Sequence, residues 1–256
     1  MNAPRGAVLG RLAGRRYLTR RGAKVPSYTA MLYLGCLAGV FAGAGVAGEF
    51  GLEWSRVVPA TIVLLVPALA GARMWFVVEH WGVYRREPGR IWRRSEGGAA
   101  LFGGLLLSVV ISIPLLALLE IPFWSYWDVA SITMLTGLIF TRVGCLMHGC
   151  CAGRATSGRL GVLLPDDRGI WERRIPTPLL EAGWAALVLA GAFLVHASRP
   201  FAGAIFLGVL VAYGACRLLL ERTRVRADWG ASRANIVFSA LLLLGGVVAL
   251  IASTPT

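Results

Sequence analysis

Apolar residues fill seven long stretches of the 256-residue chain, and short polar segments separate them. The stretches cover about 28–48, 57–79, 98–120, 124–147, 176–197, 200–221 and 234–252. A helix of about 20 apolar residues crosses the ~30 Å hydrocarbon core of a bilayer, and each stretch is about that long. The pattern therefore predicts an all-α integral membrane protein with about seven transmembrane helices.

The polar segments predict a single membrane domain with two small additions. Residues 1–27 form a basic N-terminal leader without a convincing signal-peptide cleavage site, and residues 28–256 form the membrane domain. Between the fourth and fifth stretches, about 154–175 form a small polar cap rich in Gly, Asp and Arg. Its residue pattern fits a short hairpin, a helix or a loop.

Composition and charge exclude a soluble protein and a nucleic-acid partner. Hydrophobic residues make up 57% of the chain and charged residues 15%, which would leave a soluble domain coated in apolar surface. The net charge is +13, and most Lys and Arg residues lie in the leader and in every second connection. The positive-inside rule then predicts a cytoplasmic N-terminus and contact with anionic lipid. No basic helix or aromatic stripe is arranged for binding bases.

Arg142 is a permanent charge inside the fourth apolar stretch. A guanidinium at membrane depth costs at least ~2.5 kcal/mol, so it persists where it faces a cavity, a partner or an anionic ligand. Residues 142–154, which follow without a break, are rich in glycine and cysteine. We therefore expect the functional site in this segment.

Three of the five cysteines, Cys145, Cys150 and Cys151, lie in the same segment. Together with His148 they offer thiolates and an imidazole to a metal ion, but their spacing matches no established zinc pattern. A structural disulfide between adjacent cysteines would be strained. We assign these cysteines mainly to the packing of small residues, and we expect no metal and no other cofactor.

The order of these features resembles the prolipoprotein diacylglyceryl transferase family, from about Tyr28 to the last apolar stretch. The matching segments are Ser27 to Leu34 with Tyr28; Gly71-Ala72-Arg73; Ile91-Trp92 with Gly97-Gly98; Phe102-Gly103-Gly104-Leu105; Arg174-Ile175-Pro176-Thr177-Pro178-Leu179-Leu180-Glu181; and Tyr213, Arg217 and Glu221. The family's fourth-helix pattern is Arg-x-Gly-Asn-Phe-x-Asn-x-Glu-x-x-Gly. Here Arg142, Gly144 and Gly153 match it.

The remaining positions of the pattern carry other residues in this chain. Cys145, Leu146, His148 and Cys150 stand where the family has Asn, Phe, Asn and Glu. Phe102 stands where the family has a histidine before its Gly-Gly-Leu. The resemblance therefore covers the framework more completely than the polar groups that would do the chemistry.

The resemblance implies a multi-pass enzyme of the bacterial inner membrane. Such an enzyme moves a diacylglyceryl group from phosphatidylglycerol to a cysteine sulfur of a preprolipoprotein and releases glycerol phosphate. Two alternatives stay open: a non-catalytic or transport-type protein that binds anionic phospholipid, and a transferase that acts on a different acceptor. A redox module built on the three cysteines is a more distant alternative.

Three residues are the candidate catalytic groups. Arg142 and Arg217 suit the leaving phosphate, because a guanidinium presents a planar fork to phosphate oxygens and keeps its proton. His148 is the nearest imidazole to Arg142 in sequence, and a neutral imidazole can accept a proton as a general base. Cys145 or Cys150 is the alternative, as a covalent carrier of the transferred group.

The resemblance also implies a set of substrate-binding residues. They are Tyr28, Arg73, Gly103, Gly104, Gly144, Gly153, Glu181, Tyr213 and Glu221. Glu181 is an intramembrane carboxylate that needs a partner, and we expect Arg174 or Arg142. Arg217 is expected to pair with Glu221, which lies one helical turn further on, unless it contacts the phosphate.

Overall fold

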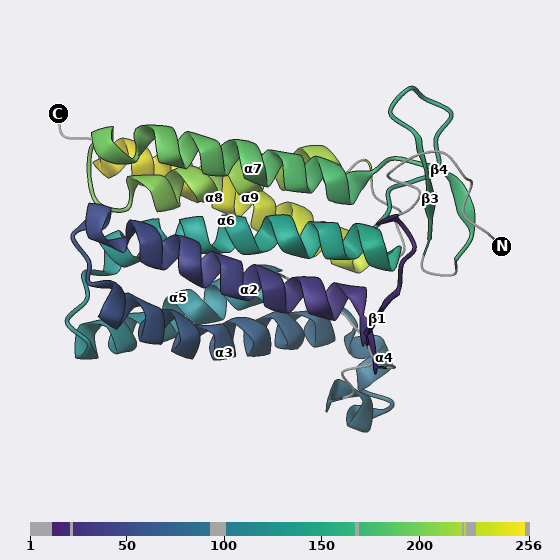
Figure 1. The fold of residues 1–256 in the computed structure, drawn as a ribbon, viewed down its shortest axis with the longest axis horizontal. Helices are drawn as coiled ribbons and strands as arrows, with labels where there is room; N and C mark the ends of the chain where they lie inside the picture. The colour runs from purple at the N-terminus through teal and green to yellow at the C-terminus, as the bar shows by residue number, and fades with distance from the viewer. Residues whose placement is uncertain are drawn as a thin grey trace.

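The computed structural model of the protein describes residues 12–20, 23–92, 101–166, 169–221, 223 and 229–253. Its long helices are α2 (Ser27–Val46), α3 (Trp54–Glu79), α5 (Leu101–Leu118), α6 (Phe123–His148), α7 (Thr177–Val195), α8 (Ala204–Glu221) and α9 (Trp229–Ser253). Within the described part, seven helices are long and apolar enough to cross a membrane. They run side by side as a bundle (Figure 1) and confirm the predicted all-α multi-span architecture.

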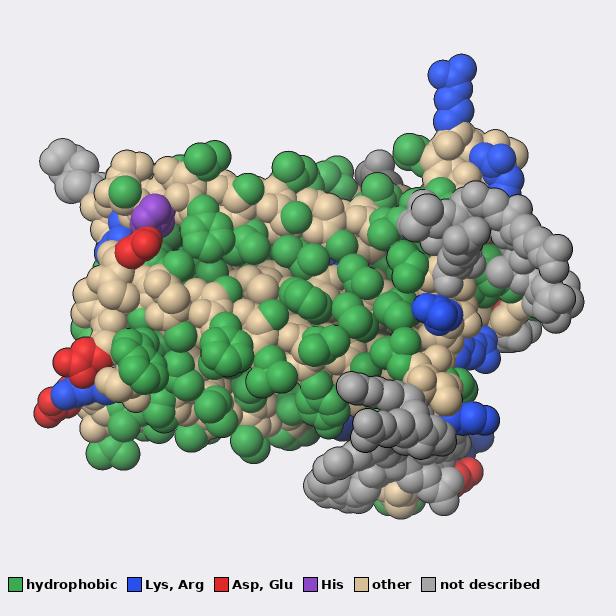
Figure 2. Space-filling model, in the orientation of Figure 1, with side chains coloured by type: hydrophobic (Ala, Val, Ile, Leu, Met, Phe, Trp, Pro, Cys, Tyr) green, Lys and Arg blue, Asp and Glu red, His purple; other side chains and the backbone are tan. Residues whose placement is uncertain are grey.

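Large apolar side chains cover the outside of this bundle along its length (Figure 2). Phe41, Leu118 and Leu194, for example, are 74%, 80% and 82% exposed. In water such a surface would drive aggregation, whereas in a bilayer it contacts acyl chains. The charged side chains visible on this face gather at the two ends of the bundle. The protein is therefore a multi-pass membrane protein whose helices cross the bilayer.

Helix α6 is the central element, and it packs against α2, α7 and α8. Its Asp128 is fully buried, and the carboxylate accepts hydrogen bonds from the backbone N–H groups of Gly203 (2.7 Å) and Phe206 (2.9 Å). These donors lie at the start of α8, where helical N–H groups have no partner within the helix. The contact joins the two helices that carry Arg142 and Arg217.

Glycines allow α3 and α5 to cross with their backbones in contact. A Cβ atom added at Gly103 would overlap the carbonyl oxygen of Gly71 and the Trp75 side chain, and one at Gly104 would overlap the carbonyl of Ala68. Only glycine permits so close an approach of two helices. The structure thus gives Gly103 and Gly104, which the resemblance placed among the substrate-binding residues, a role in packing these helices.

Short elements lie at one end of the bundle, to the right in Figure 1. They are the antiparallel hairpin of β1 (Tyr17–Arg20) and β2 (Ala23–Pro26), the helices α4 (Trp81–Tyr84) and η2 (Pro88–Trp92), and the antiparallel hairpin of β3 (Val162–Pro165) and β4 (Trp171–Arg174). Two short helices, η1 (Ala47–Phe50) and η4 (His196–Ser198), lie at the opposite end. Of the three structures that fitted the polar cap, the hairpin is the one observed.

The end with the hairpins is also the arginine-rich end of the protein (Figure 2). The described parts of the leader, of the α3–α5 connection and of the cap all lie there, as the charge pattern predicted. Part of the predicted leader forms the β1–β2 hairpin, whose chain continues directly into α2. Which membrane face this end meets stays a prediction from the positive-inside rule.

We expect Gly103→Val to destabilise the bundle by about 1–3 kcal/mol, because the new side chain must push α3 and α5 apart. The measurement is the thermal midpoint of the purified protein in detergent. Gly183→Ala is the matched control, since a Cβ at Gly183 meets no atom within 4 Å and alanine favours the helix. Equal midpoints for the two variants would show that the α3–α5 crossing tolerates the added volume.

Candidate active site

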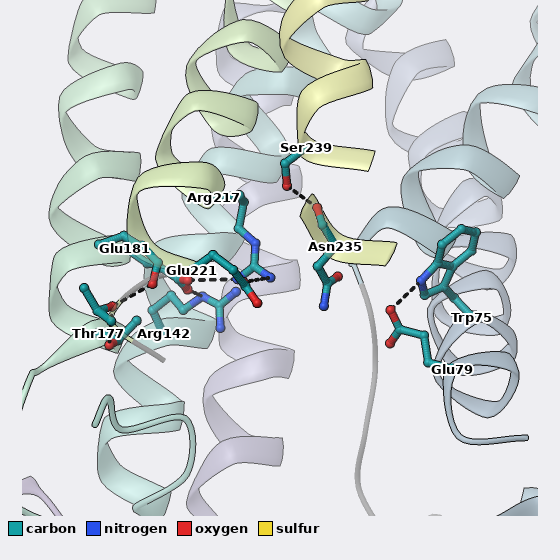
Figure 3. Close-up of polar contacts among 11 residues, drawn as sticks. Trp75, Glu79, Arg142, Thr177, Glu181, Arg217, Glu221, Asn235 and Ser239 are labelled. Carbon is teal, nitrogen blue, oxygen red and sulfur yellow. Dashed lines mark hydrogen bonds and ion pairs between the residues drawn. The ribbon is translucent and has the colours of Figure 1, made fainter. Parts of the chain in front are cut away.

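The carboxylate of Glu181 lies between the guanidinium groups of Arg142 and Arg217 (Figure 3). Its Oε1 atom accepts a hydrogen bond from Nη1 of Arg217 at 3.1 Å, and its Oε2 atom forms an ion pair with Nε of Arg142. The Arg142 contact is a close ionic one rather than an aligned hydrogen bond. The side chains of Arg142, Arg217 and Glu181 are 14%, 7% and 5% exposed.

Three helices bring these groups to the same level, near the arginine-rich end of the bundle. Arg142 lies six residues before the end of α6, and Arg217 lies four residues before the end of α8. At 1.5 Å per residue these positions are about 9 Å and about 6 Å from the helix ends. Glu181 is the fifth residue of α7, which starts at the same end. The site is therefore inside the bundle but within a headgroup's reach of the membrane surface.

Arg142 retains hydrogen-bonding capacity that Glu181 does not use. Only its Nε atom meets the carboxylate, and its two terminal nitrogens have no hydrogen bond or ion pair among the described residues. Arg217 is more fully engaged, because its Nη2 atom also lies 3.8 Å from Oε2 of Glu221. Two permanent positive charges thus share one close carboxylate, and Arg142 offers the open fork that a phosphate would bind.

An aromatic wall lies against Arg217. The guanidinium lies 5.9 Å from the ring centre of Phe102, which in turn meets the rings of Tyr213 and Phe238 at 6.0 Å each. Trp75 packs edge-on against Phe238, at 4.3 Å between ring centres. The position at which the family has a histidine therefore presents a ring that attracts the cation but accepts no proton.

A small cavity beside Arg217 lies between α6, α7 and α8. It is lined by Leu135, Leu138, Glu181, Trp184, Ala185, Val188, Val209, Tyr213, Cys216 and Arg217. Its volume is about 10 Å³, which is room for one water molecule. A lipid headgroup does not fit this space, so it must reach the guanidiniums from another side or displace side chains.

Tyr28 and Gly144 lie beside Arg142. Tyr28, in the first turn of α2, interacts electrostatically with Cys145 and Arg142 of α6 and with Cys150 and Cys151, which follow that helix. A Cβ atom at Gly144 would come within 2.8 Å of the Met31 side chain and 3.4 Å of the Tyr28 backbone, so the glycine lets α2 approach α6. Tyr28 and Arg142 are thus neighbours across the contact between α2 and α6.

Gly153 lies where three backbone segments meet. Its N–H donates to the carbonyl of Ile175 at 2.9 Å, and the N–H of Arg154 donates to the carbonyl of Thr223 at 2.8 Å. A Cβ atom at Gly153 would meet Thr177 Oγ1 and the carbonyls of Ile175 and Thr223, all within 3 Å. The glycine therefore ties the segment after α6 to the start of α7 and to the end of α8.

Two of the expected residues lie apart from the Glu181 cluster. Arg73 donates from Nε to the carbonyl of Ile91 at 3.1 Å, and its guanidinium packs over the rings of Phe76 and Tyr84. His148 is the last residue of α6, and its buried Nδ1 atom has no hydrogen-bond partner among the described residues. The structure brings neither side chain into polar contact with Arg142 or Arg217 within the part that it describes.

The structure decides between the two partners expected for Glu181. Arg142 is the partner, as one of the two expectations had it. Arg174 is not, because it forms ion pairs with Asp166 at 3.2 Å and Glu172 at 2.8 Å within the cap. The expected pair of Arg217 and Glu221 is present but longer, at 3.8 Å, than the bond from Arg217 to Glu181.

Sequence reasoning missed part of the aromatic wall of the site, and it named the cysteine group without its geometry. The aromatic partners Trp75 and Phe238 carry no signal in the sequence, because apolar aromatic residues are ordinary in a membrane span. The thiol groups of Cys145, Cys150 and Cys151, assigned above to packing, lie within 4.8 Å of one another. Hydrogen bonds with the other two thiols, followed by burial, raise the pKa of Cys150 well above its usual value.

Fold and site together define a class of protein. It is a multi-pass helical membrane protein whose bundle encloses two arginines, held by one carboxylate near the membrane surface. An open guanidinium fork at that depth suits an anionic group that belongs to the membrane itself.

The chain belongs to the prolipoprotein diacylglyceryl transferase family, whose model matches residues 17–252. This match confirms the resemblance drawn from the sequence and, with it, the expected transferase class. Three relatives are each named phosphatidylglycerol–prolipoprotein diacylglyceryl transferase. Identity to the Listeria monocytogenes protein is 27%, over 69% of this chain and 67% of that protein. Identity to the Lactiplantibacillus plantarum protein is 31%, over 70% of this chain and 67% of that protein. Identity to the Bacillus licheniformis protein is 26%, over 77% of this chain and 76% of that protein.

We expect Glu181→Gln to destabilise the protein by about 3–5 kcal/mol, because the change leaves two guanidiniums buried without their shared counter-charge. The measurement is again the thermal midpoint in detergent. Glu53→Gln is the control, since Glu53 and Arg56 form an exposed pair at 3.4 Å that contributes at most about 1 kcal/mol. A midpoint for Glu181→Gln as high as that of the control would mean that Glu181 is dispensable for holding the arginines.

Proposed function

We propose that the protein transfers a diacylglyceryl group from phosphatidylglycerol to a cysteine sulfur of a prolipoprotein, in the bacterial inner membrane, with release of glycerol phosphate. The family match over residues 17–252 and the names of the relatives support this reaction. The observation that carries it is the pair of buried guanidiniums on Glu181, with the fork of Arg142 open.

The two arginines act on the leaving group. When the bond between the glyceryl carbon and the phosphate oxygen breaks, negative charge grows on the departing glycerol phosphate. Arg142 binds this phosphate with its terminal nitrogens, and Arg217 adds a second positive charge from the other side of Glu181. Because Glu181 already holds both guanidiniums in place, little reorganisation is needed as the charge develops, and the low dielectric strengthens the attraction.

The two tyrosines orient the headgroup, because both interact electrostatically with Arg142. Tyr28 lies next to Arg142 at the start of α2, and Tyr213 lies one turn before Arg217 on α8. We assign their hydroxyls to the glycerol or ester oxygens of the lipid. The carboxylate of Glu221 lies 3.8 Å from the Arg217 guanidinium, so a bound phosphate competes with Glu221 for that guanidinium.

Five further residues of the expected binding set act through the framework rather than by touching the lipid. Four glycines, Gly103, Gly104, Gly144 and Gly153, let backbones approach where helices or segments meet. Arg73 anchors the residues after α3 through the carbonyl of Ile91. Their substitution is therefore expected to lower stability along with activity.

Deprotonation of the acceptor thiol is the step for which the family's histidine is missing. Phe102 occupies that position, and it has no proton acceptor. His148 follows Arg142 by six residues, which is about 240° around the helix, so the two side chains leave α6 in different directions. Its role as general base stays a prediction, and a His148→Gln variant tests it in the assay below. Unchanged release would remove His148 from the mechanism.

Binding of an anionic phospholipid without turnover is the second candidate function. The presence of Phe102 favours it, because the ring packs over Arg217 where the family's pattern has a potential base. Such a protein would bind phosphatidylglycerol through Arg142 but release no glycerol phosphate. A transferase with another acceptor would release it only when that acceptor is present.

We expect the wild-type protein, incubated with labelled phosphatidylglycerol and a lipobox peptide, to release glycerol phosphate, and Arg142→Ala to lower the rate by about 100-fold or more. Arg142→Lys keeps the charge but loses the fork, so its rate falls between the two. Arg56→Ala, at the opposite end of the bundle and half exposed, is the matched control with an unchanged rate.

The same assay separates the alternatives. Lipid binding that depends on Arg142, with no release from the wild type under any acceptor, would replace the transferase with the binding protein. Release that appears only with a small thiol or another nucleophile would keep the transferase and change its acceptor. A full rate in Arg142→Ala would contradict the assignment of this residue to the phosphate.

A further inference from the structure

The thiols of Cys145, Cys150 and Cys151 form a group of three sulfur donors beside Arg142. All three Sγ atoms lie within 4.8 Å of one another. Around a tetrahedral zinc ion with Zn–S bonds of ~2.3 Å, ligand sulfurs lie about 3.8 Å apart. The thiols are thus close to the separation that one thiophilic ion requires, and only small side-chain adjustments are needed to close on it.

The end of α6 brings these thiols together. Gly149 takes a left-handed conformation (φ 80°), and the N–H groups of Gly149 and Cys150 both donate to the carbonyl of Cys145, at 3.0 and 3.1 Å. This helix-ending turn folds the chain back over the last turn of α6. Cys151 then takes a second left-handed conformation (φ 62°), which a non-glycine residue rarely adopts. The backbone is thus bent twice within three residues, and the bends hold three sulfurs together.

We propose that Cys145, Cys150 and Cys151 bind one Zn²⁺ ion, whose fourth coordination position receives the thiol of the acceptor cysteine. Three protein ligands with one open position are the pattern of a catalytic zinc site, and thiolates select thiophilic ions. The burial of the group is graded, from buried Cys145 through half-buried Cys150 to exposed Cys151. An acceptor cysteine would therefore approach this group from the exposed Cys151 side. This inference rests on the transferase reaction proposed above.

Charge and neighbours support this placement. Three thiolates and one Zn²⁺ carry a net charge of −1, which needs a nearby cation at this depth. Arg142 supplies it, because its guanidinium interacts electrostatically with Cys145 and Cys151. Tyr28 interacts with all three cysteines as well as with Arg142. The proposed zinc site and the Arg142 guanidinium are therefore neighbours, which would bring an acceptor sulfur on the ion close to the phosphate of the lipid.

The proposed step balances in atoms and electrons. When the acceptor thiol binds the ion, its proton passes to water and the sulfur becomes a zinc-bound thiolate. A lone pair of that sulfur forms the C–S bond to the glyceryl carbon. The C–O bond to the phosphate breaks, and its electron pair leaves with glycerol phosphate on Arg142. The thioether is neutral and a weak ligand, so it leaves the ion.

The positions at which this chain differs from the family pattern are consistent with a metal ion taking the place of a general base. The histidine position is Phe102, while Cys145 and Cys150 occupy positions of Asn and Glu in the fourth-helix pattern. A zinc-bound thiol needs no imidazole to become a nucleophile.

Cobalt binding to the full-length protein tests the metal site without any turnover. The protein is purified in detergent with a non-thiol reductant, treated with chelator and titrated with Co²⁺. We expect one Co²⁺ per chain, with thiolate-to-cobalt charge-transfer absorption and the visible bands of tetrahedral cobalt. Cys151→Ser should weaken binding by roughly 100-fold or more, since even residues that only orient a metal ligand contribute 10- to 100-fold.

Cys36→Ser is the matched control, because Cys36 is a half-buried thiol of α2 outside the group. It should leave the cobalt spectrum unchanged. A lipobox peptide should shift the wild-type spectrum, and the same peptide with serine in place of its cysteine should not. Absence of the charge-transfer band, or the same cobalt affinity and band intensity in Cys151→Ser as in the wild type, would overturn the zinc site. Equal responses to the two peptides would overturn the open position.

Glycerol phosphate release then separates this inference from the proposed function. We expect chelator-treated protein to lose release and to regain it with Zn²⁺. Persistent release in metal-free protein would contradict the zinc mechanism and would still support the transferase. If the protein binds cobalt but the zinc-loaded wild type releases no glycerol phosphate with any acceptor, the metal site is supported and the transferase is contradicted. A comparison of the thermal midpoints of Cys151→Ser and the wild-type protein shows whether the variant is misfolded.

Discussion

The bridge that Glu181 makes between Arg142 and Arg217 is the interaction on which the rest of the structure depends. Each of these charges would be costly to bury alone, because a low-dielectric interior gives a lone ion no solvation. Grouped together, they hold α6, α7 and α8 at a common level. The packing of three helices and the position of the cationic site are thus consequences of the same ion pairs.

The bundle is organised so that this bridge can form. Asp128 at one end of α6 caps the start of α8, and the Gly153 junction at the other end joins α6 to α7 and to the end of α8. α6 is therefore tied to α8 at both ends. With both ends held, Arg142 and Arg217 have little freedom to separate, which is the preorganisation that stabilising a leaving phosphate requires.

Part of the site could be predicted from the chain alone. Arg142, Arg217 and Glu181 stand out because ionisable residues are rare in apolar spans, and a bilayer penalises them in any fold. The partner of Glu181 could not be chosen, because Arg174 and Arg142 lie 7 and 39 residues away and sequence distance says little about contact between helices. The nearer arginine turns to the acids of the cap, Asp166 and Glu172, and the distant one makes the pair.

The sequence by itself determined that the protein spans a membrane with seven helices and carries cations within them, because the length of an apolar run and the cost of a buried charge are local properties. Only the tertiary structure decided which groups meet. It set Phe102 over Arg217, took Arg73 away from the site and gathered three thiols beside Arg142. Those outcomes depend on helix packing and on two left-handed residues after α6, and residue spacing encodes neither.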